Sequence, residues 1–299
     1  MAESMTAEES WAWVTLASAK GMTAGAALRM MKSIGLPEEV LRADLTTLSR
    51  LVGMPLAQAV RAAGAGANDA EVERAVSWLN EQPQTQLLPI AAPNYPMMLI
   101  QSGFAPLVLW LRGNAELLQR RIISAAGTEQ PSDKAQENAR EFGEALAYQG
   151  AAVAAMLTSG VEAAALEGAL RAGGALAVLA VGPDRVYPAS ALNLQRKILA
   201  EGGLLLSAYP PGDGIPASGS EREARLNEVS ALCAALSEGV LVIAAERCSP
   251  AVRRARLAAD FGREVWAVPG DIHSSESGGP HQLIREGAKL AESAADIFS

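Results

Sequence analysis

Short apolar runs alternate with amphipathic segments from residue 120 onward. Strands that alternate with helices form right-handed β-α-β crossovers and a parallel sheet covered on both faces. The segment DKAQENAREFGEALAYQ places Ala135, Ala139, Phe142 and Leu146 on one helical face, and Ser132 is a suitable N-cap. We therefore predict an α/β fold, a Rossmann-like, doubly wound and mainly parallel sheet over 120–299. Its strands are RIISAA, AAVAAML, ALAVLAV, GLLLSA, GVLVIAA and EVWAV.

The residues before this alternation divide into two parts. Residues 1–82 show apolar positions at helical spacing, interrupted by Gly21, Gly35 and Gly53, and predict an all-helical, SAM-like N-terminal domain. Residues 83–119 contain several prolines and no helical period, which predicts a linker that leads into an extended segment at 107–112.

Composition and charge exclude several classes of protein. The apolar runs are too short for a membrane span, and the acidic N-terminus is unlike a signal peptide. Two cysteines, Cys233 and Cys248, argue for a reducing compartment, so we expect a cytoplasmic protein without disulfides or zinc. The formal net charge of -8 lacks the Lys and Arg surplus typical of nucleic-acid binding. Arg253, Arg254, Arg256 and Arg263 are close in sequence, and indicate either a local basic patch or a solvated helix face.

Ligands of doubly wound sheets bind beyond the carboxyl ends of the strands, so the loops that follow the strands are the candidate site. Gly127 and Gly160 each stand between a strand and a helix, where free backbone N–H groups and the helix dipole favour phosphate. Each glycine could equally serve only to turn the chain. The loops to inspect are 127–131, 158–160, 182–187, 208–212, 246–250 and 269–273.

Catalytic and metal-binding interpretations have little support. Nucleophilic catalysis would use Cys248 or Ser249 as the nucleophile, His273 as the base and Asp271 to orient that base. The residue types are suitable, but no nucleophile elbow accompanies them. For His281 we expect a helix-start or buried hydrogen-bonding role. No Cys, His and acidic cluster has ligand spacing, so we predict no metal site, and we expect no cofactor.

Three long segments together resemble the DNA-processing protein A (DprA, or Smf) family. They are YPMMLIQSGFAPLVLWLRGN, GVEAAALEGALRAGGALAVLAVGPDRVYP and FGREVWAVPGDIHSSESGGPHQLIREGAKLAESAADIF. The resemblance covers roughly residues 10–299. It implies a dimeric, non-enzymatic protein that binds single-stranded DNA and hands it to the RecA recombinase in natural transformation. The chain stops at Ser299, where family members often continue into a winged-helix domain.

The matching positions are mostly structural, whereas the family's pocket motifs are altered. The family's Gly-Ser-Arg appears as Gly127-Thr128-Glu129, which reverses a charge, and Met156 replaces a glycine of the second loop. Glu162 stands for the family's Asp, the Arg-Asn-Arg motif falls at 229–231 without its arginines, and SPAVRRA replaces Ser-Gly-Ser-Leu-Ile-Thr-Ala. We expect a scaffold that is kept and a site that is rewritten or abandoned.

Three functions follow as alternatives from this resemblance. The first is a DprA-like protein with weakened contacts to single-stranded DNA and a RecA-type recombinase as partner. The second is a degenerate paralogue that acts as a dimerisation module, as a homodimer or with an intact DprA, and the third is a small-nucleotide sensor. The candidate DNA- or phosphate-binding residues are Gly127, Thr128, Gly160, Lys197, Arg253, Arg254, Arg263 and Gly270.

Overall fold

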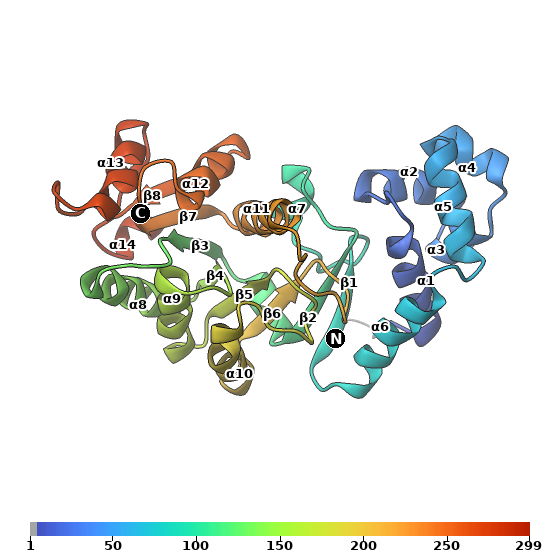
Figure 1. The fold of residues 1–299 in the computed structure, drawn as a ribbon, viewed down its shortest axis with the longest axis horizontal. Coiled ribbons are helices and arrows are strands. Elements are labelled where there is room, and N and C mark those ends of the chain that lie inside the picture. The colour runs from blue at the N-terminus through green and yellow to red at the C-terminus, as the bar shows by residue number, and fades with distance from the viewer. Residues whose placement is uncertain (1–4) are drawn as a thin grey trace.

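The N-terminal part is helical in the computed structural model, which describes residues 5–299 (Figure 1). Thr6 starts the first helix with a capping box: its hydroxyl accepts from the Glu9 N–H, and the Glu9 carboxylate accepts from the Thr6 N–H. Gly35 and Gly53 end two of the helices with positive φ, as expected of glycines that break a helical pattern. The helices are α1 (Ala7–Ser18), α2 (Ala24–Ile34), α3 (Pro37–Arg42), α4 (Leu45–Val52), α5 (Met54–Gly64) and α6 (Asp69–Glu81).

A nine-stranded sheet with the order β1-β2-β6-β5-β4-β3-β7-β8-β9 forms the rest of the framework. The six predicted strands are confirmed as β3 to β8, and all their pairings with one another are parallel. The strands are β1 (Thr85–Pro89), β2 (Val108–Gly113), β3 (Ile122–Gly127), β4 (Ala152–Met156), β5 (Ala175–Leu179), β6 (Leu204–Ser207), β7 (Gly239–Ala244), β8 (Glu264–Ala267) and β9 (Lys289–Leu290).

The segment 83–119 is part of the sheet, which corrects our prediction of a linker there. Its strands β1 and β2 pair antiparallel, and β2 pairs antiparallel with β6, so both extend the sheet past its parallel part. Trp110 on β2 is buried and meets Trp78 of α6 edge to face, with ring centroids 6.3 Å apart. The expected extended stretch at 107–112 coincides with β2, and its apolar side chains join the helical part to the sheet.

Helices cover both faces of the sheet, as a doubly wound fold requires (Figure 1). Helices α8, α9 and α10 pack on one face, while α11 and α12 pack on the other. The remaining helices are α7 (Met97–Ser102), α8 (Asp133–Tyr148), α9 (Gly160–Arg171), α10 (Leu192–Ala200), α11 (Gly219–Leu236), α12 (Pro250–Asp260), α13 (Gly278–Arg285) and α14 (Ala295–Phe298), with short 3-10 helices at Ala115–Gln119, Ala189–Ala191 and Ser275–Ser277.

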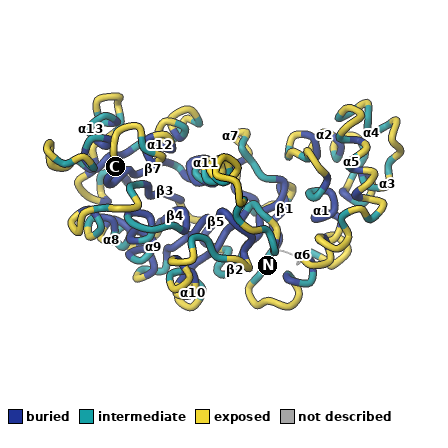
Figure 2. The backbone as a smooth tube through the Cα atoms, in the orientation of Figure 1, coloured by how far each residue is buried: buried dark blue, intermediate teal, exposed yellow. Residues whose placement is uncertain are grey.

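Small residues allow these layers to approach closely. A Cβ at Gly143 of α8 would collide with the Ala165 carbonyl of α9, and one at Gly168 of α9 would collide with the Arg140 carbonyl of α8. Figure 2 shows the strands β3, β4, β5 and β7 as buried chain between exposed outer helices. Across residues 5–299 the structure contains no helix with the length and apolar character that crossing a bilayer requires.

Candidate functional site

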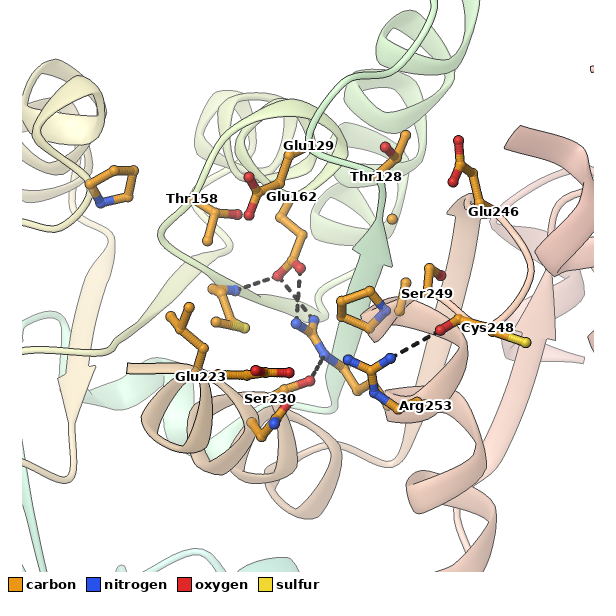
Figure 3. Close-up of a pocket in the computed structure, with 18 of the residues that line it drawn as sticks. Thr128, Glu129, Thr158, Glu162, Glu223, Ser230, Glu246, Cys248, Ser249 and Arg253 are labelled. Carbon is orange, nitrogen blue, oxygen red and sulfur yellow. Dashed lines mark hydrogen bonds and ion pairs between the residues drawn. The ribbon is translucent and has the colours of Figure 1, made fainter. Parts of the chain in front are cut away.

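The strand order reverses at β3, which pairs with β4 on one side and β7 on the other. The chain runs outward from β3 to β6 in one direction and from β7 to β9 in the other. Such a reversal separates two neighbouring loops at the carboxyl ends of the strands and leaves room for a ligand. A cavity of about 560 Å³ lies there, lined by the loops after β3, β4 and β7 and by α11 and α12 (Figure 3).

The two glycine loops pack against each other at this edge. The Thr128 N–H donates to the Ala244 carbonyl at 2.8 Å, and the Val161 N–H donates to the Thr128 carbonyl at 3.0 Å. A Cβ at Gly127 would collide with Val161, and one at Gly160, whose φ is +67°, would collide with the Thr128 carbonyl. Both glycines therefore have a structural role in bringing the loops together, and these backbone groups are already hydrogen-bonded.

The N-terminus of α8 carries a carboxylate from the distant 3-10 helix Ser275–Ser277. Ser132 is its N-cap, as predicted, because the hydroxyl accepts from the Ala135 N–H. The Glu276 carboxylate in turn accepts from the Ser132 N–H at 3.0 Å and from the Ser132 hydroxyl. Helix N-termini attract anions, so the protein's own Glu276 fills the anion position that the sequence indicated.

A buried ion pair forms the floor of the cavity. Arg254 of α12 and Glu162 of α9 make two N–H···O bonds of 2.9 Å, and both residues are almost fully buried. The Met156 N–H donates to Glu162 at 2.7 Å, while Arg254 also donates to the Ala125 carbonyl and the Ser230 hydroxyl. Figure 3 labels Glu162 and Ser230, and its dashed lines mark the hydrogen bonds that these two residues accept. Burial, the largest single effect, lowers the pKa of the Arg254 guanidinium, but the Glu162 carboxylate and Cys233 together outweigh it, so the pKa is raised.

The four clustered arginines lie in different environments and form no shared patch among the described residues. Arg254 is buried, and Arg256 forms an exposed pair with Glu286 at 2.8 Å. Arg263 donates to the Met98 carbonyl at 2.7 Å and joins the turn before β8 to α7. Of the four, Arg253 alone turns an exposed side chain to the cavity, where it donates to the Cys248 carbonyl at 3.0 Å. Of these four arginines, Arg253 is therefore the exposed one at the cavity, Arg254 is buried at its floor, and Arg256 and Arg263 make contacts elsewhere.

The structure brings only part of the predicted site together. Gly160 packs against the backbone of Thr128 and Glu129, and Lys197 is exposed on α10. Gly270 donates its N–H to His281 Nε2 at 3.3 Å, which agrees with a hydrogen-bonding role for that histidine. None of these three lines the cavity, and neither does Arg263. The predicted residues that do line it are Gly127, Thr128, Arg253 and Arg254.

Several cavity residues were not predicted from the sequence. Glu223, Asn227 and Ser230 follow one another at i, i+4 and i+7 on α11, a spacing that puts them on one helix face and could have revealed them. Arg247 and Glu246 come from the loop after β7, which was among the loops to inspect, although neither residue was named as a candidate. The mouth of the cavity therefore carries charges of both signs. They are the exposed carboxylates of Glu129, Glu223 and Glu246 and the guanidinium groups of Arg247 and Arg253.

The residues considered for nucleophilic catalysis do not assemble. The Ser249 hydroxyl caps α12 by accepting from the Val252 N–H, and His273 donates its backbone N–H to Asp271 in a loop that does not line the cavity. Cys248 is exposed and lines the cavity, away from that histidine and aspartate. Within residues 5–299, no three His, Cys, Asp or Glu side chains are grouped to hold a metal ion.

The Rossmann-like sheet and the cavity at its strand reversal define an α/β protein with a candidate ligand site, and comparisons identify the family. Residues 86–299 match the family described as DNA recombination-mediator protein A. The chain is 32% identical to Protein Smf of Escherichia coli over 228 residues, and 30% identical to DNA processing protein DprA of Bacillus subtilis over 213 residues. It therefore belongs to the DprA/Smf family.

These relatives are covered to different extents. The matched region is 76% of this chain but 59% of Protein Smf, and 71% of this chain and 69% of the Bacillus subtilis protein. The X-ray structure of DprA from Streptococcus pneumoniae superposes with a TM-score of 0.78 at 26% identity, over 99% of this chain and 98% of that one. A DprA structure from Helicobacter pylori shares the fold, with a TM-score of 0.62 at 23% identity over 72% of this chain and 94% of that one.

The two cysteines should react very differently with a thiol reagent. Burial raises the pKa of the Cys233 thiol to about 12, so its thiolate is scarce at pH 8, whereas Cys248 is exposed at the cavity. We expect a disulfide reagent to label one thiol rapidly in the native protein and the second only after denaturation. Peptide mapping should place the rapid label on Cys248; rapid labelling of Cys233 would contradict the described packing of α11.

Proposed function

We propose that this protein binds single-stranded DNA and delivers it to a RecA-type recombinase. The observation that supports this most is the match to Streptococcus pneumoniae DprA over nearly the whole of both chains, together with the family assignment. The Helicobacter pylori DprA, which shares the fold, has a single-stranded DNA binding mode described as unique. The cavity at the strand reversal is the position where this fold binds ligands.

The DNA contacts that we propose are few and lie at the cavity mouth. Arg247 and Arg253 are the exposed guanidinium groups there, and guanidinium groups suit phosphate oxygens. Arg254 is engaged by Glu162 and contributes structure to the floor. The carboxylate of Glu129 faces the same space and opposes a phosphate, so we expect weak and strongly salt-dependent binding.

A fluorescence-anisotropy titration with oligo-dT tests this proposal. Each lost phosphate contact lowers the slope of log K against log salt by about 0.7 for single strands, so Arg247→Ala/Arg253→Ala should lower it by about 1.4. Arg285→Ala, an exposed arginine at the end of α13, is the control and should leave the slope unchanged. No binding by the wild-type protein at low salt would refute direct DNA recognition.

Delivery to a recombinase needs a separate measurement. The expected result is faster filament formation by a RecA-type recombinase on oligo-dT coated with a single-strand-binding protein when this protein is added. The Arg247→Ala/Arg253→Ala variant should lose this stimulation with its DNA affinity. If the protein bound DNA but did not speed filament formation, it would be a DNA-binding protein that does not deliver DNA to the recombinase.

A dimerisation module is the second candidate function. It is favoured by the internal carboxylates Glu162 and Glu276, which occupy anion positions while the apolar scaffold is retained. The proposed partner is a second copy of this chain or a DprA paralogue. Light scattering on the purified protein, alone and mixed with such a paralogue, should then show a dimer; a monomer in both samples would contradict this candidate.

A further inference from the structure

The cavity has the size and walls of a small-molecule site. Its volume of about 560 Å³ is within the range of roughly 300–1,000 Å³ that is typical of ligand pockets. Met156, Leu226 and Pro188 supply apolar surface, and Tyr187 lies beside Pro188 in the lining. Such walls suit a flat heterocycle, because aromatic and apolar side chains bury its faces.

The anion positions in the interior of the cavity and at the N-terminus of α8 are already filled. The Glu162 carboxylate accepts hydrogen bonds from the Met156 N–H and from two guanidinium N–H groups of Arg254. The Glu276 carboxylate accepts from the Ser132 N–H at the N-terminus of α8. The Val161 N–H at the start of α9 donates to the Thr128 carbonyl. A phosphate group that entered would have to displace one of these partners, so the interior offers it little compensation for its lost hydration.

The charge of the lining also disfavours a phosphate. Glu129, Glu223 and Glu246 line the cavity together with the buried Glu162, against the guanidinium groups of Arg247, Arg253 and Arg254. The carboxylates outnumber the cations, and Figure 3 shows Glu129 and Thr158 on one side with Glu223 and Ser230 on the other. Carboxylates at this edge of a Rossmann-like sheet suit ribose hydroxyls and amino groups, which donate hydrogen bonds.

One donor at the floor remains for a neutral ligand. Arg254 has five N–H hydrogens, and the described residues accept four: two go to Glu162, one to Ala125 and one to Ser230. The fifth, on Nη2, has no acceptor among them. Arg254 lines the cavity although it is almost fully buried, so a ring nitrogen or carbonyl oxygen placed there would satisfy this donor.

We infer that the cavity binds a ribonucleoside that carries an exocyclic amino group, and prefers it to the phosphorylated form. The heterocycle lies against the apolar walls and accepts from the floor, while its amino and ribose hydroxyl groups donate to the rim carboxylates. This inference does not rest on the proposed function, because it depends on the carboxylates, the apolar walls and Arg254, whereas the proposed DNA contacts are Arg247 and Arg253.

Calorimetric titration of the full chain with adenosine and with adenosine monophosphate tests the inference. We expect adenosine to bind with a dissociation constant below about 1 mM, and the monophosphate to bind at least about tenfold more weakly. No adenosine binding in this range, or equal or tighter binding of the monophosphate, would overturn it. The oligo-dT titration tests DNA binding in a separate experiment, so nucleoside binding and DNA binding can each be refuted without the other.

Carboxylate variants give a second test with a matched control. Glu129→Gln/Glu223→Gln keeps the size of two exposed side chains but removes their charges, and it should weaken adenosine binding about tenfold or more. The control is Glu221→Gln, which changes an exposed residue of α11 that does not line the cavity. This variant should bind adenosine like the wild type. Unchanged adenosine affinity in the double variant would overturn the inference.

Discussion

Arg254→Met should lower the free energy of unfolding by about 3–5 kcal/mol, because it leaves the Glu162 carboxylate buried without its partner. The loss is large because Arg254 also holds the Ala125 carbonyl of β3 and the Ser230 hydroxyl of α11. One side chain thus joins elements on both sides of the strand reversal. Urea denaturation followed by circular dichroism measures the effect as a lower midpoint.

Two further variants separate the buried pair from a general effect of losing an arginine. Arg256→Met removes an exposed arginine of the same helix, whose pair with Glu286 is open to solvent, and should change stability little. Arg254→Met/Glu162→Leu removes both charges and should recover the part of the loss that comes from the unpaired carboxylate, since an apolar pair of similar volume is often as stable as a buried ion pair. A midpoint for Arg254→Met equal to that of the wild type would contradict the buried pair.

The same pair affects how DNA-binding experiments are interpreted. A variant that lacks Arg254 is expected to lose structure at the cavity floor, so weaker DNA binding by it says little about a phosphate contact. Arg253, which is exposed and donates to the Cys248 carbonyl, is the informative position on this helix. Any effect of a combined change at 253 and 254 must be compared with unfolding measured on the same sample.

The parallel part of the fold was predictable because its signals are local. Each strand from β3 to β8 is a nearly continuous apolar run, and the N-cap at Ser132 is visible as a serine before a helical period. The strands β1 and β2 were not predicted as part of the sheet, because they stand among prolines. Their pairing depends on β6, which lies far along the chain. The position of the candidate site followed from the rule that ligands of doubly wound sheets bind beyond the carboxyl ends of the strands.

The composition of the site was less predictable because its partners are distant in sequence. Glu162 and Arg254 are 92 positions apart, so the run of arginines could not show which of them is neutralised. A local signal did exist: Arg254 stands three residues after the buried Ala251 and four before the buried Ala258, on the inner face of α12. Glu276 reaches Ser132 across 144 positions, and nothing near either residue indicates that contact.

Glu129→Arg should strengthen binding of oligo-dT by about tenfold at low salt, which corresponds to about 1.4 kcal/mol. The change removes a carboxylate from the cavity mouth and adds a guanidinium group beside Thr128, so the slope of log K against log salt should steepen by about 0.7. Anisotropy titrations at several salt concentrations measure both quantities. Glu141→Arg, the same charge change at an exposed position of α8 away from the cavity, should have a much smaller effect.

The Glu129→Arg variant also distinguishes the two ligands proposed for this region. The substitution removes an acceptor for amino and hydroxyl groups, so adenosine affinity should fall while oligo-dT affinity rises. Opposite shifts would show that the Glu129 carboxylate selects against phosphate and for a neutral ligand. An unchanged oligo-dT affinity would contradict the expectation that this carboxylate limits DNA binding, and would indicate that the first loop no longer approaches a DNA strand.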